Sequence, residues 1–462
     1  MKRAFNKKIN ELKDYFAVSV NFDIIAKDIK VGEKRGFLLL IDGLIKDLIT
    51  STIIANLNEL KIKKPSIKEI INCIAYVETE VSADIKTQEK MLLSGSVLLF
   101  VEGEDSAVII DTREYPIRSI SEPELERVTR GSRDGFVETL IFNTALIRRR
   151  LRDKRLRFVI NNVGSSSKTD VVIAYLDTVA DKEYVSDMKE KLKNIETDSL
   201  LVSEKTLVEL LIPNQWYNPL PKVRYTERPD VASAHLLEGH LLLIVDNSPN
   251  VIILPSTIFH FLQHPEDYYQ HPLVGNYIRI LRLFAIIVSY LLIPLWYLLI
   301  TNKALLPSFL SFIIPNNDSN ISFFLQLLFL EFGIDLLKLS SIHTPSSLTT
   351  SMSIISGLIL SNLAISTGWL SPEAILAVAV VSVCSFATPH QELAMAIQMF
   401  RLFVFILTAI FGLAGFIISN IVVFIIFLST KNNSKTKYLY PLIPFNFSRL
   451  KSVFIRFPFR NK

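Results

Sequence analysis

Two carboxylates and one ammonium group interrupt an otherwise apolar stretch of the chain, Ile321–Leu339. Glu331 and Asp335 are four residues apart, so on a helix they share one face, and Lys338 falls on that face as well. Charged side chains are costly inside a membrane and normally face protein or water. Two interpretations remain open. The stretch is an interfacial helix with a solvated edge, or it lines a cation pathway in which both carboxylates are hydrated and oligomerisation turns each into a ring.

This stretch belongs to a series of hydrophobic segments in the second half of the chain. The first of them has eighteen residues, no charge and one proline, and it measures about 27 Å at helical rise, close to the thickness of a hydrocarbon core. The segments are Leu283–Ile300, Ile321–Leu339, Ile354–Leu370, Ala374–Ala387 and Leu402–Leu428. We therefore predict an α-helical multi-span membrane domain over residues 271–430.

The charge of the two chain ends predicts a topology. The tail, Lys431–Lys462, has eight basic and no acidic residues and seven Phe or Tyr residues, which places it on the cytoplasmic side by the positive-inside rule. The start of the chain is charged throughout and lacks the pattern of a signal peptide, so the N-terminal part is expected to be cytoplasmic too. Both ends on one side require an even number of crossings. We expect four full crossings, with Ala374–Ala387 as the segment that does not cross.

Residues 1–270 have a different chemistry, with 40 of the 45 acidic and 37 of the 50 basic side chains. This charge density is typical of a water-soluble protein. A hairpin pattern occurs twice: Gly95-x-x-Leu98-Leu99 aligns without a gap on Gly239-x-x-Leu242-Leu243, and the strands that follow also match. Either two buried hairpins merely look alike, or the region consists of two related α/β lobes. We predict the second, with lobes over residues 1–130 and 131–270.

The sequence offers no enzyme site. It has no P-loop, no GxSxG, no HExxH and no Cys/His spacing typical of a metal site. His260 and His264 would be one helical turn apart, but no third ligand is evident, so ordinary interfacial histidines are the simpler interpretation. The two cysteines, Cys73 and Cys384, are too few for a disulfide framework. We therefore predict a non-enzyme with no metal and no cofactor.

A run of arginines, Arg148–Arg157, has six arginines and one lysine against one aspartate. It is either a solvated helix end or a surface for an anionic partner, such as lipid headgroups or an acidic subunit face. No aromatic residues alternate with these charges, so the run does not indicate nucleic-acid binding.

Several long motifs resemble one family. They are EPELERVTRGSRDGFVETLIFNTALIRRRLRD, KTD, VRYTERPD, EGH and PLVGNYIRILRLFA. On these stretches the chain is similar to the GerA family, the A subunits of bacterial spore germinant receptors, over roughly residues 20–430. Within the family, RYTERPD and IHTPSSL most resemble the member associated with the operon for dipicolinic-acid release. The motif residues, whose role the sequence does not explain, are Ser132, Arg133, Asp134, Gly135, Glu138, Lys168, Thr169, Asp170, Arg228, Pro229, Asp230, Glu238 and Gly239.

The resemblance implies a two-lobed α/β domain followed by a helical membrane domain, in a protein of the spore inner membrane. It further implies homo-oligomers that conduct ions during germination, with the lipid bilayer and other germination membrane proteins as partners. It transfers no catalytic residue. The alternative is a non-conducting adaptor, in which the α/β domain assembles germination complexes and the hydrophobic segments only anchor it. An inverted repeat of hydrophobic segments would favour a third class of protein, a secondary transporter, and no such repeat is visible in the sequence.

Overall fold

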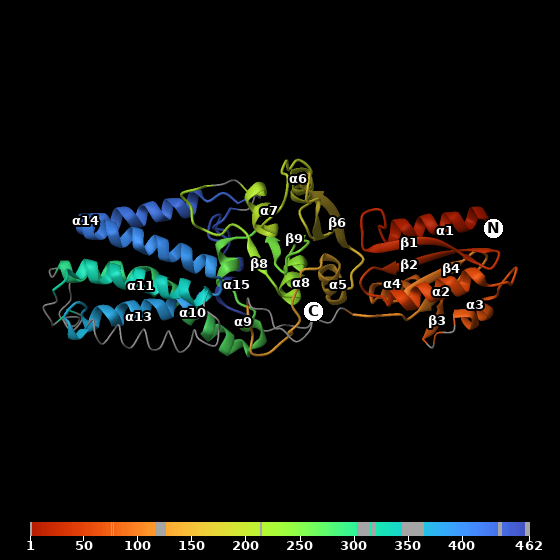
Figure 1. Cartoon of the computed structure of the whole chain (residues 1–462), viewed down its shortest axis with the longest axis horizontal. Helices are drawn as coiled ribbons and strands as arrows, with labels where there is room; N and C mark the ends of the chain where they lie inside the picture. The colour runs from red at the N-terminus through yellow and green to blue at the C-terminus, as the bar shows by residue number, and fades with distance from the viewer. Residues whose placement is uncertain are drawn as a thin grey trace. The chain divides into compact units, whose positions relative to one another are not determined.

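A computed structural model of the protein describes residues 2–74, 76, 78–115, 126–212, 215–302, 314–315, 320–343, 365–432 and 437–457. The chain forms two compact units. One consists mainly of Met1–Asn214 and Val223–Ser256, and the other of Gln215–Lys222, Thr257–Asn432 and Thr436–Lys462. Among the described residues, the strands all lie in the first unit and the second unit is helical (Figure 1).

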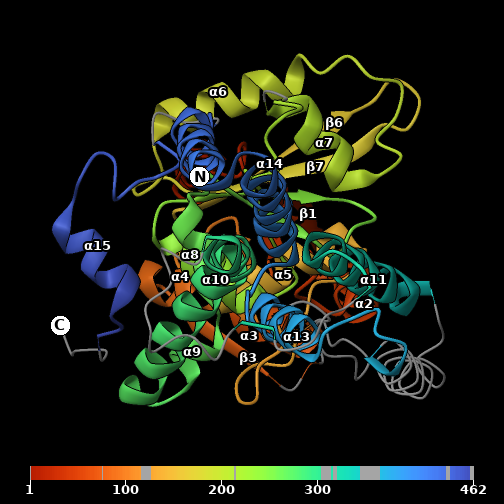
Figure 2. The same cartoon turned by 90° about the vertical axis from the view of Figure 1, so that its left-hand side faces the viewer.

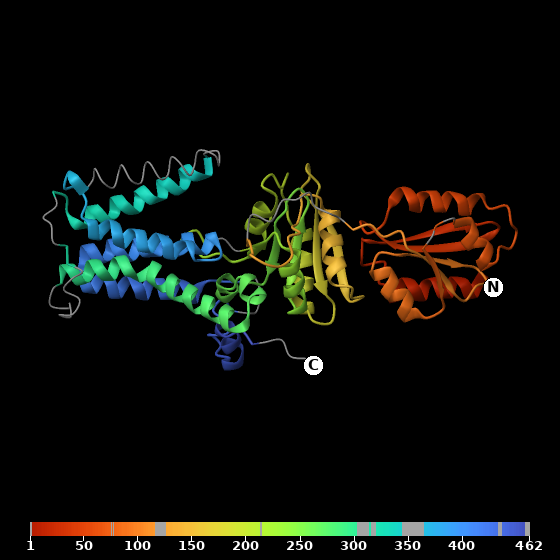
Figure 3. The same cartoon turned by 90° about the horizontal axis from the view of Figure 1, so that it is seen from below.

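The first lobe of the strand-containing unit is a five-stranded sheet in the order β1-β2-β4-β5-β3, with every neighbouring pair antiparallel. Helices lie on both of its faces (Figure 3). Its elements are α1 (Lys2–Tyr15), β1 (Ile24–Val31), β2 (Lys34–Ile41), α2 (Asp47–Glu59), α3 (Ile67–Ile74), β3 (Thr79–Ser82), α4 (Ile85–Leu93), β4 (Val97–Val101) and β5 (Ala107–Ile110). Helices α1 and α4 pack on one face, and α2 and α3 on the other.

The second lobe repeats this topology, with strand order β6-β7-β9-β10-β8. Its elements are α5 (Leu140–Arg150), β6 (Leu156–Val163), β7 (Thr169–Leu176), α6 (Lys182–Lys193), α7 (Ser203–Leu211), β8 (Arg224–Thr226), α8 (Pro229–Leu237), β9 (Leu241–Val245) and β10 (Val251–Leu254). Helices α6 and α7 cover one face, and α5 and α8 the other. Because both faces are covered, the central strands are continuous apolar runs although the sheets are antiparallel.

The two predicted hairpins are present, β4–β5 in the first lobe and β9–β10 in the second. The aligned glycines explain why the pattern recurs. Gly95 and Gly239 each end a helix just before the hairpin, with φ of +101° and +94°, a conformation that glycine adopts without steric cost. At the hairpin turn, Gly103 aligns on Asn247, and both have positive φ. Asparagine is one of the few other residues that tolerates this region.

An ion pair buried between the lobes joins them. Arg148 on α5 is 0% exposed and Asp23, just before β1, is 2% exposed. Arg148 Nε and Nη2 donate to the Asp23 carboxylate at 3.0 and 2.9 Å. The neighbouring Asn21 Oδ1 accepts from the backbone N–H of Phe158 at 3.0 Å, and Phe22 N donates to the Phe158 carbonyl. The segment before β1 therefore runs beside β6 of the other lobe.

The helical unit begins with the short helices η1 (Ile258–Leu262) and α9 (Glu266–Tyr269). The long helices follow: α10 (Pro272–Thr301), α11 (Phe323–His343), α13 (Pro372–Phe386) and α14 (Gln391–Ser429), and then the short α15 (Phe447–Phe454). By length and composition, α10 and α14 are the two described helices that are long and apolar enough to cross a membrane. Helices α11 and α13 run parallel, because Gln326 meets Ser371 near their starts and Lys338 meets Phe386 near their ends.

The longest predicted segment, Leu402–Leu428, does not form one continuous helix. At Gly412 the backbone is non-helical, with φ +59° and ψ −135°. The rings of Phe400 and Phe427 lie 5.7 Å apart, whereas a straight helix would separate these residues by about 40 Å. Helix α14 is therefore a hairpin of two antiparallel arms (Figure 1). The turn was not apparent in the sequence because the residues around Gly412 are as apolar as the arms.

Three of the other four predicted hydrophobic segments correspond to helices of the structure. Leu283–Ile300 lies within α10, Ile321–Leu339 largely within α11, and Ala374–Ala387 corresponds closely to α13. Most of Ile354–Leu370 lies outside the described residues. The boundary between the units falls after Ser256 rather than after residue 270, because η1 and α9 pack with the helices.

Candidate functional site

Helix α11 places its two carboxylates in different environments. Glu331 is 3% exposed, and its Oε2 accepts a hydrogen bond from Arg401 Nη2 on α14 at 2.6 Å. Arg401 is also buried, and its Nη1 donates to the backbone carbonyl of Ser289 on α10 at 2.7 Å. This charge pair joins three helices. Loss of either partner would leave an uncompensated buried charge, which costs about 3–5 kcal/mol.

Asp335, one turn further along α11, remains partly accessible, with 37% of its side chain exposed. Its Oδ1 accepts a hydrogen bond from Gln398 Nε2 on α14 and lies 3.8 Å from Lys338 Nζ. Lys338 in turn donates to Gln398 Oε1 at 3.3 Å. Gln398 thus bridges an acid and a base on the edge of an apolar bundle.

The pathway interpretation requires both carboxylates to be hydrated, whereas Glu331 is buried against Arg401. The last predicted hydrophobic segment begins at Leu402 and excludes Arg401, whereas in the structure Arg401 belongs to α14 and is buried. A buried guanidinium needs a counter-charge, and Glu331 supplies it. Asp335 and Lys338 stay on the accessible edge.

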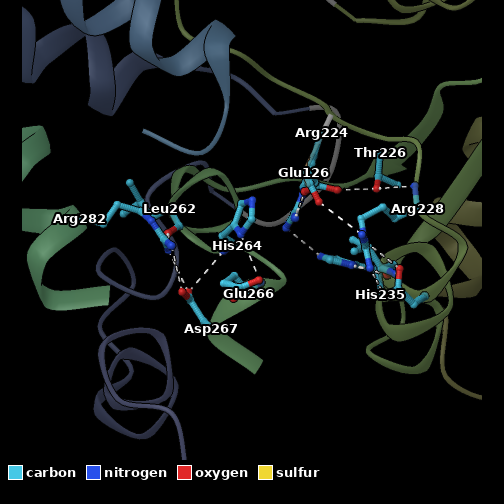
Figure 4. A network of polar contacts seen from close by, with 12 residues as sticks. Glu126, Arg224, Thr226, Arg228, His235, Leu262, His264, Glu266, Asp267 and Arg282 are labelled. Atoms are coloured by element: carbon cyan, nitrogen blue, oxygen red, sulfur yellow. Dashed lines mark hydrogen bonds and ion pairs between the residues drawn. The ribbon is translucent and has the colours of Figure 1, made fainter. Parts of the chain in front are cut away.

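The motif residues of the second lobe form a separate polar network around Arg228, which is 1% exposed (Figure 4). Arg228 Nε and Nη2 donate to the two carboxylate oxygens of Asp230 at 3.1 and 2.7 Å. Its Nη2 also donates to the backbone carbonyl of Ser132 at 3.1 Å, and its Nη1 to that of Glu126 at 3.4 Å. One guanidinium therefore ties the segment 126–132 to the start of α8, where Pro229 occupies the first turn.

Glu126 gives this segment a second attachment. Its carboxylate, buried in the second lobe, accepts from Arg224 Nη2 at 2.5 Å and from Thr226 Oγ1 at 2.6 Å. Both partners lie on the edge strand β8, and Arg224 Nη1 also lies 3.4 Å from His235 Nε2 on α8 (Figure 4). The network thus binds the segment that contains Glu126 to β8, the edge strand of the second sheet.

The Ser132–Glu138 stretch continues this attachment. Asp134 pairs with Arg150 at the end of α5 and accepts a hydrogen bond from Ser132 Oγ. Burial raises the pKa of the Asp134 carboxyl, but the hydrogen bonds from Arg150 and Ser132 outweigh it and leave the pKa below its ordinary value. Gly135 is buried, and the carbonyl of Glu138 accepts from Asn247 N at 2.8 Å. The side chains of Glu138 and Arg133 are both exposed.

The remaining motif residues shape two turns. Lys168 has φ +45° in the turn between β6 and β7, where Thr169 Oγ1 donates to Ser167 Oγ at 3.0 Å. The Asp170 carbonyl accepts from Asp246 N at 3.0 Å. Glu238 and Gly239 end α8, and a Cβ at Gly239 would lie 3.1 Å from the carbonyl of Val179. The described contacts of the motif residues are structural: they set turns, caps and the strap formed by residues 126–138.

The arginines of the run have partners within the strand-containing unit, although only Arg148 is fully buried. Arg148 is buried against Asp23, and Arg149 stacks on Tyr115 at 4.5 Å. Further along, Arg155 pairs with Asp153, and Arg157 lies 3.5 Å from Asp177. These contacts give four of the six arginines an acidic partner within the chain.

The histidines before the first long helix serve as local caps. His260 lies in the 3-10 helix η1, which ends at Leu262, so His260 and His264 do not share a helix turn. His260 Nδ1 accepts from Thr257 N at 2.9 Å, and His264 Nδ1 from Glu266 N at 3.2 Å. His271 caps α10. These bonds account for one ring nitrogen of each histidine.

Beside these histidines lies an arginine cluster that the sequence analysis missed (Figure 4). Asp267 is 0% exposed and accepts from Arg282 at 2.9 Å through both carboxylate oxygens. Arg279 Nε lies 3.4 Å from the same carboxylate, and Arg456 Nη1 donates to the Asp267 carbonyl at 2.8 Å. A sequence signal exists for part of it: two arginines one turn apart at the start of an apolar helix need a counter-charge or a solvated position.

Comparison with known proteins identifies the family. The model of the Bacillus/Clostridium GerA spore germination proteins matches residues 10–462. This chain belongs to the GerA family. The GerA-family chain is 40% identical over 450 residues to stage V sporulation protein AF of Bacillus subtilis (strain 168), covering 96% of this chain and 90% of that protein. It is 30% identical to spore germination protein KA of the same organism, covering 98% and 84%.

A solved structure also resembles part of the GerA-family chain: the N-terminal domain of the A subunit of the Bacillus megaterium spore germinant receptor GerK3. It is 23% identical and covers 53% of this chain and 91% of that one, with a TM-score of 0.41. The resemblance inferred from the motifs is thus confirmed at the level of the family, and the relative associated with stage V sporulation is among the matches.

Proposed function

We propose that this GerA-family chain is a multi-span subunit of the spore inner membrane that assembles with copies of itself and conducts ions during germination, at the stage of ion and dipicolinate release. Its relatives are named as spore germination and stage V sporulation proteins. Helix α10 and the two arms of α14 supply the apolar surfaces that a bilayer would contact. The strand-containing unit carries the surface charge of a water-soluble domain and is assigned to the cytoplasm.

The arrangement of the helical unit supports a topology with both ends on one side. The two arms of α14 run antiparallel, so its second arm returns toward the level at which its first arm began. The tail that follows is bound to the start of α10, where Arg279 Nη1 donates to the carbonyl of Val453 at 2.8 Å. The basic tail and the start of α10 therefore share one end of the bundle, which is assigned to the cytoplasmic face.

The observation that carries the proposal is the partial exposure of Asp335 and Lys338 on α11, because the most exposed side chains between Phe323 and Leu339 are all apolar. Charged groups in a spanning helix are tolerated where they face protein or water. Glu331 meets this condition by pairing with Arg401. Asp335 meets it in an oligomer whose water-filled axis lies along this edge of α11, where Asp335 and Lys338 line the pathway.

The experiment is ion release from spores that carry Asp335→Asn at normal protein level. The amide keeps the size and a hydrogen bond to Gln398, and it removes one negative charge from each subunit. The electric field of charges that line a water-filled pathway raises the local concentration of counter-ions by about tenfold or more. We therefore expect cation release to slow by about that factor in the variant. Asp187→Asn is the matched control, because Asp187 forms an exposed i,i+4 pair with Lys191 outside the bundle. Ion release in Asp335→Asn spores at the control's rate defeats the pathway assignment.

A non-conducting adaptor is the second candidate, and one observation favours it. The Glu331–Arg401 pair is buried and neutral as a unit, and it ties α10, α11 and α14 together as a packing element rather than a pore wall. Under this reading Asp335→Asn is silent, whereas Glu331→Gln disrupts the bundle and lowers protein level. Asp335→Asn therefore separates the candidates, because Glu331→Gln breaks the same buried pair under either of them and serves as the packing control.

A further inference from the structure

The short C-terminal helix α15 leaves large aromatic side chains uncovered. Phe447 is 68% exposed and Phe454 is 39% exposed, and Phe445 and Phe457 at its two ends are 68% and 50% exposed. Phe447 and Phe454 are seven residues apart, two helical turns, and so point to the same side. Contiguous exposed apolar surface of this kind marks a contact with a membrane or a protein.

Only one side of α15 is used for packing within its unit. Leu450 and Val453 pack against the core formed by η1, α14 and the tail, while Phe447 and Phe454 remain outside that core. Lys451 lies between the two phenylalanines along the helix, and its ammonium group is 5.4 Å from the Phe457 ring. The uncovered face therefore combines aromatic rings with positive charge. This combination is typical of helices that lie in a membrane interface.

Helix α15 is fixed in place at the start of α10. Arg279 Nη1 donates to the carbonyls of Ser452 and Val453, two of the orphan acceptors at the C-terminus of α15. Asn276 exchanges two hydrogen bonds with the backbone of Arg456, at 3.2 and 2.6 Å. At the other end, Asn446 Oδ1 caps the helix by accepting from Arg449 N at 3.1 Å. The aromatic face is thus presented by an anchored helix rather than by a frayed end.

The direction of α15 suits the same role. Seen along the long helices, α10, α13 and α14 appear nearly end-on, whereas α15 is seen from its side (Figure 2). It therefore lies across the bundle axis, as a helix in the plane of a membrane surface would. If α10 crosses the bilayer, its first turns and α15 lie at the level of the headgroups.

Charge selects the kind of lipid. Arg279 and Arg282 pair with one carboxylate, that of Asp267, and Arg456 donates to the Asp267 backbone carbonyl, so these three arginines beside α15 outnumber the acid that they contact. The tail Lys431–Lys462 adds no acidic residue. Basic residues near an anionic membrane surface are attracted to its headgroups. Zwitterionic headgroups offer no comparable gain.

We propose that the face of α15 formed by Phe447, Lys451 and Phe454 binds anionic phospholipid headgroups, with the two phenylalanines inserted at the acyl-chain boundary. This inference rests on the membrane location proposed above. It adds a lipid requirement to the end of the bundle where α10 begins. Because Arg279 links α15 to α10, lipid binding at this face would hold the first turn of α10 at the headgroup level.

The test uses the full chain in lipid nanodiscs, with a fluorescent NBD label on one introduced cysteine. The labelled variants are Phe447→Cys and, as matched control on the adjoining polar side, Ser448→Cys, both in a background in which Cys73 and Cys384 are replaced by serine. In phosphatidylglycerol we expect a blue-shifted label at 447 that is quenched by doxyl lipids and protected from iodide. The label at 448 should stay quenchable by iodide. In phosphatidylcholine the shift at 447 should be smaller.

A second variant, Arg449→Gln with Lys451→Gln, tests the charge. It should raise at least threefold the fraction of phosphatidylglycerol needed for the half-maximal shift at 447. Equal iodide quenching at 447 and 448 in phosphatidylglycerol overturns the inference. Protection of 447 in detergent, with cross-links between two copies, also overturns it and assigns the face to a second copy of the chain. A chain that remains in the lipid-free fraction refutes the membrane location instead. A solvent-exposed label on a chain that has entered a nanodisc refutes only the lipid contact of α15.

Discussion

Asp23→Leu should destabilise the two-lobed unit far more than any exposed charge change. Arg148 is 0% exposed and has three hydrogen bonds to Asp23, so the variant leaves a buried guanidinium without its counter-charge. Its other bonds, to the carbonyls of Asp153 and Leu156, are long at 3.4 Å and offer little compensation. Breaking one side of such a pair costs about 3–5 kcal/mol. For a domain of total stability about 5–15 kcal/mol, that is a large fraction.

The assay is urea unfolding of residues 1–256, with the loss of structure monitored by circular dichroism. With a slope of about 3 kcal/mol per molar urea, the expected loss lowers the midpoint by about 1–2 M. Arg148→Met should cost a similar amount, and the double variant should cost clearly less than the sum of the two, because it leaves no lone charge. The control pair is Asp28 and Arg35, which is exposed and should couple by less than about 1 kcal/mol. Additive single effects, or a loss no larger than that of the control, would refute the reasoning.

Three further predictions follow from single contacts. Arg228→Lys removes the fork that holds the strap, so native-state trypsin cleavage at the arginines of residues 127–133 should rise about 5- to 100-fold, measured by timed digestion. Gly412→Ala forces alanine into a conformation that costs about 1–3 kcal/mol, so thermal unfolding of the full chain should begin earlier, whereas Gly333→Ala, inside α11 with open space around it, should be neutral or slightly stabilising. Because the native pKa of Asp134 is lowered, its stabilisation is present above its ordinary pKa near 3.8 and is lost as pH falls through the native value; urea unfolding of Asp134→Asn should therefore show a weaker acid dependence below pH 4 than the wild type.

The two-lobed organisation could be predicted because it depends on local signals. Gly95 and Gly239 each precede a short apolar strand, and the same spacing yields the same hairpin in both lobes. The edge strand β8 shows no strand pattern in the sequence, because it lies within residues 212–230, which contain four prolines. Three residues of strand among four prolines give too little pattern to detect, and what holds β8 is pairing with β10.

Long-range pairing limited the prediction of the candidate site. The helix with Glu331 and Asp335 was recognised from its apolar pattern, but nothing local shows that Arg401, seventy residues later, reaches Glu331. Because a buried charge needs a partner, the sequence indicates that Glu331 requires a cationic side chain nearby. Only the fold shows that this side chain is Arg401. The turn at Gly412 could not be predicted for a related reason. The residues around it are as apolar as the two helical arms, so no polar residue marks the turn in the sequence.

The central claim is that assembled copies of this chain pass cations through a pathway edged by Asp335. The most direct measurement is cation flux into vesicles that contain only the purified full chain, compared with protein-free vesicles and with vesicles that contain the Asp335→Asn variant at equal density. We expect flux well above the protein-free background for the wild-type chain and a fall of about tenfold for the variant. Wild-type vesicles that are no more permeable than protein-free ones, with the chain inserted and oligomeric, would contradict it.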